Sequence, residues 1–193
     1  MTVVNGMQGP HDMGVLSEHY KSWLYDPVRH GGGVLADQAT YGLDYLIWVL
    51  GRPQSVSAAQ LDVKRHANGW VDDMVTVVLG YPCATAVAMA SWAWPHPRAE
   101  ILCYGPKGSL CLRDGTLVRK DHSVRFDIPV EPQAVEPPQM PPERSYGIAW
   151  FVHCLRNGLD IEAPHSVELN VTVCEVADAA KRSIAEGRAV AMG

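Results

Sequence analysis

Three polar residues, Asp37, Tyr41 and Asp44, follow one another at intervals of four and three residues within a largely apolar stretch. If this stretch is helical from about Val34, the three side chains share one face of the helix. A phenol is a weak acid with a pKa of about 10, which a nearby cation and hydrogen-bond partners can lower. Tyr41 could then exchange a proton with a substrate hydroxyl or carbonyl, while Asp37 orients Tyr41 or binds the substrate.

A run of three glycines, Gly31, Gly32 and Gly33, comes just before these residues. Glycines allow unusual backbone dihedrals and would let a flat ligand, such as a cofactor, approach the backbone at the start of the helix. In a simpler interpretation the glycines form a tight loop, Asp37 pairs locally and the Tyr41 ring packs on its neighbours. From the residues alone, both interpretations stay open.

Weaker candidates for substrate contacts are scattered along the chain. Asp44 belongs to the polar helix face, and Tyr25 comes shortly before the glycines. His11 follows a Gly-Pro turn that could line a pocket but could equally be only a turn, and Arg98 lies in the middle of the chain. Substrate contacts usually come from several such dispersed polar groups.

The elements that must position these residues follow from periodicity. A strand is predicted at Val3–Met7, one or two helical turns are predicted before residues 25–27, and the best helix runs from about Val34 until Gly51 and Pro53 end it. Strand-like runs with short turns then favour consecutive antiparallel pairing in a meandering sheet. These runs cover residues 55–66, 72–81, 83–94, 99–105, 109–114, 116–120 and 123–130.

The last third of the chain is predicted to contain a connector and two helices. The proline-rich residues 129–143 should be extended. Residues 145–158 and 165–187 have helical periodicity and end at a glycine, and Ser166 is placed as an N-cap. The fold class is therefore α+β, an open and mostly antiparallel sheet with helices packed on one face, and residues 1–193 should form one domain.

Both faces of the strand at residues 83–92 are largely apolar. Since a strand that meets water usually has one polar face, both faces should be covered. Helices can cover one face, and a second copy of the chain can cover the other. A central strand buried within a monomer is the alternative.

Composition excludes several classes of partner and site. The net charge of −5 and the absence of long charge blocks argue against nucleic acid and anionic membranes as partners. No apolar run reaches the length of a membrane span and no targeting segment precedes the first strand, so we expect a cytoplasmic protein. The five cysteines are predicted to be reduced core residues, and neither they nor the eight histidines have metal-ligand spacing, so no metal is expected.

The order and spacing of the motifs resemble a known family. The pattern W-x-Y-D-P, then G-G-G-x-L-x-D-x-x-x-Y-x-x-D and L-G-x-P, occurs at residues 23–53. It is similar to the start of the C-terminal domain of the glucose-fructose oxidoreductase/inositol dehydrogenase (Gfo/Idh/MocA) family, which is related to the C-terminal fold of dihydrodipicolinate reductase. The resemblance continues through residues 71–81, the SWAW segment, the GPKGSL turn and the last helix, over nearly the whole chain.

The resemblance implies a function for the polar helix face. In this family a Rossmann domain binds NAD or NADP, and the C-terminal domain holds a sugar, polyol or related substrate and forms oligomers through its open sheet face. Members commonly have Asp-x-x-x-His, and here Tyr41 stands at the histidine position, which looks like the tyrosine variant of the family. The resemblance thus implies Tyr41 as the acid/base and Asp37 as its supporting or substrate-binding partner.

Two family features do not occur in this sequence. There is no Gly-x-Gly-x-x-Gly after a strand and no Glu-Lys-Pro segment. We therefore expect that the nucleotide-binding domain is absent, that the isolated chain binds no cofactor tightly, and that the parent enzyme or a separate Rossmann subunit supplies it. Two alternatives stay open: an independent oligomeric module that binds small molecules, and a non-redox proton transfer by Asp37 and Tyr41.

Overall fold

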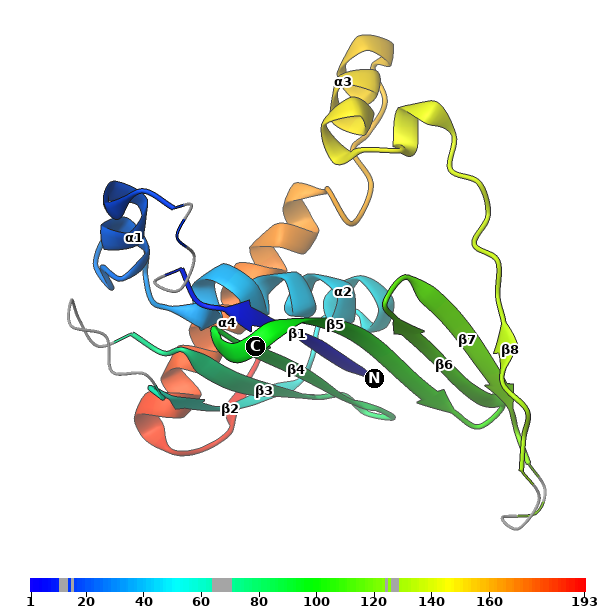
Figure 1. Cartoon of the computed structure of the whole chain (residues 1–193), viewed down its shortest axis with the longest axis horizontal. Coiled ribbons are helices and arrows are strands. Elements are labelled where there is room, and N and C mark those ends of the chain that lie inside the picture. Colours follow the sequence, from blue (N-terminus) through cyan, green and yellow to red (C-terminus); the bar gives the residue numbers. More distant parts are fainter. Residues whose placement is uncertain (11–13, 15, 64–70, 124, 126–128) are drawn as a thin grey trace.

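One mixed sheet of nine strands dominates the structure (Figure 1), a computed structural model that describes residues 1–10, 14, 16–63, 71–123, 125 and 129–193. The order of the strands across the sheet is β8-β7-β6-β5-β1-β4-β3-β2-β9. The strands are β1 (Thr2–Gln8), β2 (Ser55–Leu61), β3 (Met74–Gly80), β4 (Thr85–Ser91), β5 (Ala93–Gly105), β6 (Gly108–Arg113), β7 (Thr116–Asp121), β8 (Gln133–Ala134) and β9 (Val190–Ala191). The predicted open, mostly antiparallel sheet is confirmed.

The first strand departs from the predicted meander. Strand β1 lies between β4 and β5, parallel to β4 and antiparallel to β5, so these two consecutive strands do not pair with each other. Gly6 makes this insertion possible, since a Cβ there would lie 2.5 Å from Cε3 of Trp94 and 2.7 Å from the carbonyl oxygen of Ser91. Local turn signals could not reveal a strand inserted from far away in the sequence.

The helices agree with the predicted periodicity, with one local difference. They are α1 (Glu18–Leu24), α2 (Thr40–Leu50), α3 (Gly147–Asn157) and α4 (Val167–Glu186), with one turn of π-helix, η1 (Leu35–Ala39), before α2 and a short 3₁₀ turn, η2 (Pro142–Arg144), before α3. Ser166 caps α4 as predicted, its hydroxyl accepting from the backbone N–H of Leu169. No helix in the described ranges is long and apolar enough to cross a bilayer.

Helices α2 and α4 cover one face of the sheet, where small residues allow close packing. A Cβ on Gly42 of α2 would lie 3.4 Å from both Ala88 of β4 and Val3 of β1. The alternate residues of β4 that face the helices, Ala86, Ala88 and Ala90, are buried. The core therefore lies between α2, α4 and strands β1 to β4 (Figure 1).

The opposite face of the sheet has no helix against it in the described part of the chain (Figure 1). The ladder register places Val87, Met89 and Val78 on this face, together with Val4 of β1. Val78 is exposed, and Val87 and Met89 are half-buried. Strand β4 thus has two apolar faces, as predicted, and only one of them is covered by helices.

Several smaller expectations need correction. Cys154 is buried, but Cys83 and Cys174 are exposed and are not core residues. The proline-rich residues 129–141 contain no helix, as predicted, but β8 within them pairs with β7, and Pro142 and Glu143 at their end belong to η2. Half of the residues of the strand predicted at 123–130 lie outside the described residues, and its described positions, 123, 125, 129 and 130, are not in a strand. In the described ranges, no three His, Cys, Asp or Glu residues are grouped as metal ligands.

The close contact between α2 and the sheet leads to a first prediction. Valine at position 88 would place two extra methyl groups where α2 approaches most closely, and we expect Ala88→Val to lower the free energy of unfolding by about 1–3 kcal/mol. The control, Ala59→Val, makes the same change on an exposed position of β2. Urea unfolding measures both variants, and equal stabilities would contradict the packing described.

Candidate functional site

The glycine loop before η1 is held by the buried carboxylate of Asp72. Oδ1 accepts a hydrogen bond from the backbone N–H of Gly33 at 3.0 Å, and Oδ2 accepts from that of Leu35 at 2.7 Å. The backbone carbonyl of Asp72 also accepts from the N–H of Val34 at 2.9 Å. A Cβ on Gly33 would lie 2.0 Å from this carbonyl oxygen, so only glycine fits there.

This clamp changes the interpretation of the glycines. The N–H groups of residues 33 to 35 already donate to Asp72. They are therefore not available to bind an anionic group of a cofactor, as an open helix N-terminus would be. Gly31 and Gly32 have φ of 87° and 131°, which favours glycine, and an approach of a ligand to these two residues stays a prediction.

Asp72 was not among the predicted site residues. It lies 39 residues from Gly33, and an acidic pair before an apolar strand does not show that one carboxylate turns back to a distant loop. Burial raises the pKa of Asp72, while the hydrogen bonds from Leu35 and Gly33 lower it. A buried carboxylate that accepts backbone N–H groups is well suited to hold a loop in one conformation.

Asp37 lies in the π turn directly after the clamp. Single π turns inside α-helices occur frequently at functional sites. Oδ2 of Asp37 accepts a hydrogen bond from Nε1 of Trp92 at 3.2 Å. Trp92 is buried, and its ring meets the buried ring of Tyr25 edge to face, with centroids 5.8 Å apart. The buried pair of Trp92 and Tyr25 thereby orients Asp37. Tyr25, which was predicted to contact a substrate, lies in the core and packs against Trp92.

The surroundings of Asp37 favour a carboxyl group that holds a proton more readily than usual. Burial raises the pKa of Asp37, whereas the hydrogen bond from Trp92 and the charge of His30 lower it. Perturbed carboxyl groups of this kind cluster at functional sites. The carboxyl of Asp37 can therefore accept a hydrogen bond from a ligand hydroxyl or share a proton with it.

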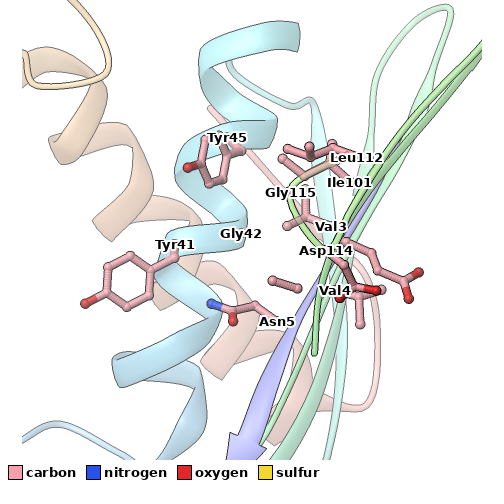
Figure 2. Close-up of a pocket in the computed structure, with 12 residues that line it drawn as sticks. Val3, Val4, Asn5, Tyr41, Gly42, Tyr45, Ile101, Leu112, Asp114 and Gly115 are labelled. Carbon is pink, nitrogen blue, oxygen red and sulfur yellow. The ribbon is translucent and has the colours of Figure 1, made fainter. Parts of the chain in front are cut away.

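Tyr41 and Asp44 lie farther along α2 in different surroundings. Tyr41 is 61% exposed, and its phenol points away from the neighbouring strands (Figure 2). Within the described part of the chain, Oδ1 of Asp44 is buried without a hydrogen-bond partner. Burial raises the pKa of Asp44, and the charge of His165, which precedes α4, lowers it. Asp37, Tyr41 and Asp44 thus share one helical segment, and their predicted roles remain open.

An apolar pocket of about 510 Å³ lies between α2 and strands β1, β5 and β6 (Figure 2). Its lining includes Val3, Asn5, Tyr45, Ile101 and Leu112. Tyr41 is among the residues around this pocket, but its ring points to the other side of the helix. The pocket and the exposed phenol are therefore separate features of α2.

Arg98 is not brought to this site. The β1–β5 register places it beside Gly6 on the face of the sheet opposite α2. There Nε of Arg98 donates to Oε1 of buried Glu100 at 2.7 Å, and Nη2 of Arg113 donates to Oε2 at 3.0 Å. The hydrogen bond from Arg98 is the largest influence on Glu100 and lowers its pKa. His11, another predicted contact, lies outside the described residues.

Comparison with protein families gives one match. The family model described as "GFO/IDH/MocA C-terminal domain" matches residues 4–111, from β1 into β6 and including η1 and α2. These residues make up more than half of the chain and contain Asp37, Tyr41, Asp72 and Trp92. A comparison with curated protein sequences gives no match.

Solved structures with the same fold are longer than this chain. A levoglucosan dehydrogenase in complex with NADH has a TM-score of 0.75 and 18% identity over 100% of this chain and 57% of its own. An aldose-aldose oxidoreductase from Caulobacter crescentus, complexed with glycerol, has a TM-score of 0.72 and 21% identity over 99% and 55%. An oxidoreductase from Agrobacterium radiobacter in complex with NAD+, L-tartaric acid and magnesium has a TM-score of 0.68 and 17% identity over 99% and 56%. The chain spans about half the length of these proteins.

The raised pKa of Asp37 predicts a pH-dependent difference in stability. In Asp37→Asn the side chain keeps an acceptor for Trp92 but cannot ionise. As the pH rises from below about 3.9, the unperturbed value, the unfolded wild-type chain loses this proton before the folded protein does. The wild type therefore loses stability relative to Asp37→Asn until the pH passes the raised pKa, after which the difference stays constant.

Urea unfolding at a series of pH values measures this difference. Asp178→Asn, which removes an exposed carboxylate from α4, is the control for a change of surface charge. A stability difference between wild type and Asp37→Asn that is the same at every pH would contradict the burial of the Asp37 carboxyl.

Proposed function

Because the chain belongs to the Gfo/Idh/MocA family, whose C-terminal domain it matches, we propose that it is the substrate-side half of an NAD(P)-dependent oxidoreductase. The substrate would be a sugar, a polyol or a related hydroxy or keto compound. The observation that carries this proposal is the half-buried carboxyl of Asp37, oriented by Trp92, one helical turn before the exposed phenol of Tyr41. The ligands named for the similar structures, such as levoglucosan and glycerol, support this substrate class.

In this proposal Tyr41 moves a proton and Asp37 positions the substrate. The phenol of Tyr41 would take the proton from a substrate hydroxyl during oxidation, or return it to the carbonyl oxygen during reduction. Asp37, held by Trp92, would accept a hydrogen bond from a neighbouring hydroxyl and so fix the reacting carbon. Asp44 would contact the substrate farther along the helix.

The start of η1 does not fit the pyrophosphate of a dinucleotide cofactor. The backbone N–H groups of residues 33 to 35 donate to Asp72, so these three donors are not available to hold it. We therefore assign the NAD(P) site to a nucleotide-binding domain outside this chain. Two proteins similar to this chain, the levoglucosan dehydrogenase and the Agrobacterium radiobacter oxidoreductase, have solved structures with NADH or NAD+, and each is nearly twice as long.

Helix α3 offers a surface for such a domain. It stands away from the sheet beyond the N-terminal end of α4 (Figure 1). Ile148, Phe151 and Leu155 recur at helical spacing on its exposed side. An apolar helix face of this kind normally packs against another domain or protein. We propose that the nucleotide-binding domain covers it.

The second uncovered surface is the sheet face that contains Val78, Val87 and Met89. We propose that this face joins copies of the chain into a homo-oligomer. Its apolar centre and the Arg98, Glu100 and Arg113 cluster beside it combine an apolar core with a charged rim, as protein interfaces commonly do.

The proposed proton transfer can be tested with Tyr41→Phe. The variant lacks the hydroxyl but keeps the ring, and we expect kcat/KM to fall by roughly 10²- to 10⁴-fold. The measurement is NADH formation with a panel of sugars and polyols as substrates. The protein is either a polypeptide that contains this chain and a nucleotide-binding domain, or the chain mixed with a separate nucleotide-binding domain. Tyr104→Phe, on the exposed end of β5, is the control. A Tyr41→Phe variant as active as the wild type would contradict the role of Tyr41.

The proposed oligomer can be tested with Val78→Asp. A carboxylate at the centre of the open sheet face would have to be buried on association, so the oligomer should dissociate. Val49→Asp makes the same change on the exposed side of α2 and should leave assembly unchanged. Light scattering measures the mass of each. A wild-type chain that is monomeric at every concentration, or a Val78→Asp variant that assembles normally, would contradict the proposal.

A further inference from the structure

Three aromatic rings line up beside the start of η1. The rings of Tyr20 and Trp23, both on α1, have centroids 5.9 Å apart. The ring of Trp23 meets that of His30 edge to face, with centroids 4.7 Å apart. Tyr20 and Trp23 are 43% and 40% exposed, although large aromatic rings are usually more deeply buried. The aromatic row of Tyr20, Trp23 and His30 therefore presents ring surface to solvent.

His30 joins this row to Asp37. Its Nδ1 pairs with the carbonyl oxygen of Gly32. Since a carbonyl oxygen only accepts, Nδ1 carries the hydrogen, and Nε2 of the neutral ring is an acceptor. The backbone N–H of Asp37 donates to the carbonyl oxygen of Gly33 at 3.1 Å, so Asp37 lies one turn from the Gly32 carbonyl that His30 contacts. The row thus ends at two hydrogen-bond acceptors, Nε2 of His30 and the carboxyl of Asp37.

Other tryptophans of the chain are placed differently. Trp92 is buried. The ring of Trp150 has the guanidinium of Arg144 4.0 Å from its centroid and stacks on His153. Trp94 packs closely over Gly6 on the open side of the sheet. Among these, Trp23 combines an exposed ring with a link to the carboxyl group of the site.

This combination matches the chemistry of a sugar ring. A pyranose has a face of C–H groups, which packs on the electron-rich face of an aromatic ring, and hydroxyls at its edge, which donate to acceptors. A flat, purely apolar ligand would leave Asp37 and His30 without donors, which is unfavourable once they are covered. A short polyol would leave the ring faces uncovered. The row therefore favours a cyclic sugar over either.

We propose that Tyr20, Trp23 and His30 form a stacking subsite for a pyranose ring, beside the carboxyl of Asp37. The choice of a sugar rests on the proposed function, whereas the placement of the ring on α1 goes beyond it. In this arrangement Trp23 contacts the C–H face of the sugar, and His30 and Asp37 accept hydrogen bonds from its hydroxyls. Selectivity for cyclic sugars then depends on α1, outside the helix that bears Tyr41.

The test is a titration of the chain with methyl β-D-glucopyranoside, followed by NMR of the tryptophan indole N–H groups. We expect saturable shifts of the Trp23 and Trp92 signals, while the signal of Trp48, which is similarly exposed at 48% on α2, does not move. Glycerol, which has no ring, should bind more weakly than the glucoside. With the Trp92 signal as the probe, Trp23→Ala should weaken binding roughly 2- to 10-fold, the range expected for loss of an aromatic contact.

Two further variants complete the experiment. Trp23→Phe keeps a smaller ring and should have intermediate affinity, which separates stacking from a loss of folding in Trp23→Ala. Trp48→Ala removes an equally exposed indole and should bind the glucoside as the wild type does. Unshifted signals elsewhere in the spectrum show that each variant is folded.

The outcomes separate this subsite from the proposed enzymatic function. If the glucoside moves the backbone signals of Asp37 and Tyr41 but not the Trp23 indole, the subsite is wrong and the proposed function stands. The same holds if Trp23→Ala binds as tightly as the wild type, or if no indole signal shifts saturably. If Trp23 responds as expected but Tyr41→Phe retains full NADH formation, the subsite stands and the catalytic assignment is wrong.

Discussion

The contact between the Asp72 carboxylate and the backbone of residues 33 to 35 is the interaction on which the rest of the site depends. It joins the start of η1 to the residues just before β3. These buried hydrogen bonds therefore fix where η1 and α2 begin relative to the sheet. The π turn then follows directly, and the carboxyl of Asp37 accepts from Trp92, which lies between β4 and β5. Without this clamp the glycine loop would lose partners for its buried N–H groups, which is costly inside a protein.

The packing of this helix against the sheet buries acidic side chains, which is unfavourable for their charged forms. Asp37, Asp44 and Asp72 each have a raised pKa because burial disfavours the carboxylate. Asp72 offsets this with backbone hydrogen bonds, which is a structural use. Asp37 and Asp44 are less fully paired and lie beside histidines, which is the arrangement expected where a ligand completes the hydrogen bonds. Burial of a carboxyl group thus has two uses here. At Asp72 it accompanies the hydrogen bonds that hold the loop, and at Asp37 and Asp44 it leaves groups that a ligand can pair.

The surfaces left uncovered divide the proposed tasks of the chain among different elements. The open sheet face is apolar along β3 and β4, the exposed side of α3 is apolar over its length, and α1 carries aromatic rings beside Asp37. An oligomer, a nucleotide-binding domain and a sugar would then each meet a different part of the fold. Since the solved structures that share the fold are nearly twice as long, uncovered apolar surface on this chain has a physical explanation in the proposed assembly.

Local patterns determined most elements of this protein, because periodicity and capping act within a few residues. The helices that end at Gly51 and Gly187 and the N-cap of Ser166 lie where they were predicted, and strands β2, β3, β4, β6 and β7 lie close to the predicted runs. Strand β5 is longer than predicted, since it continues from Ala93 through residues 95–98 to Gly105. The family and the polar face of Asp37 and Tyr41 were also recognisable from short motifs. Tertiary structure alone decided the insertion of β1 between β4 and β5, the turn of Asp72 towards the glycines, the position of Arg98 on the far face of the sheet and the exposure of Cys83. Each of these depends on which distant strand lies alongside another, and strand register is a global property that no local run of residues encodes.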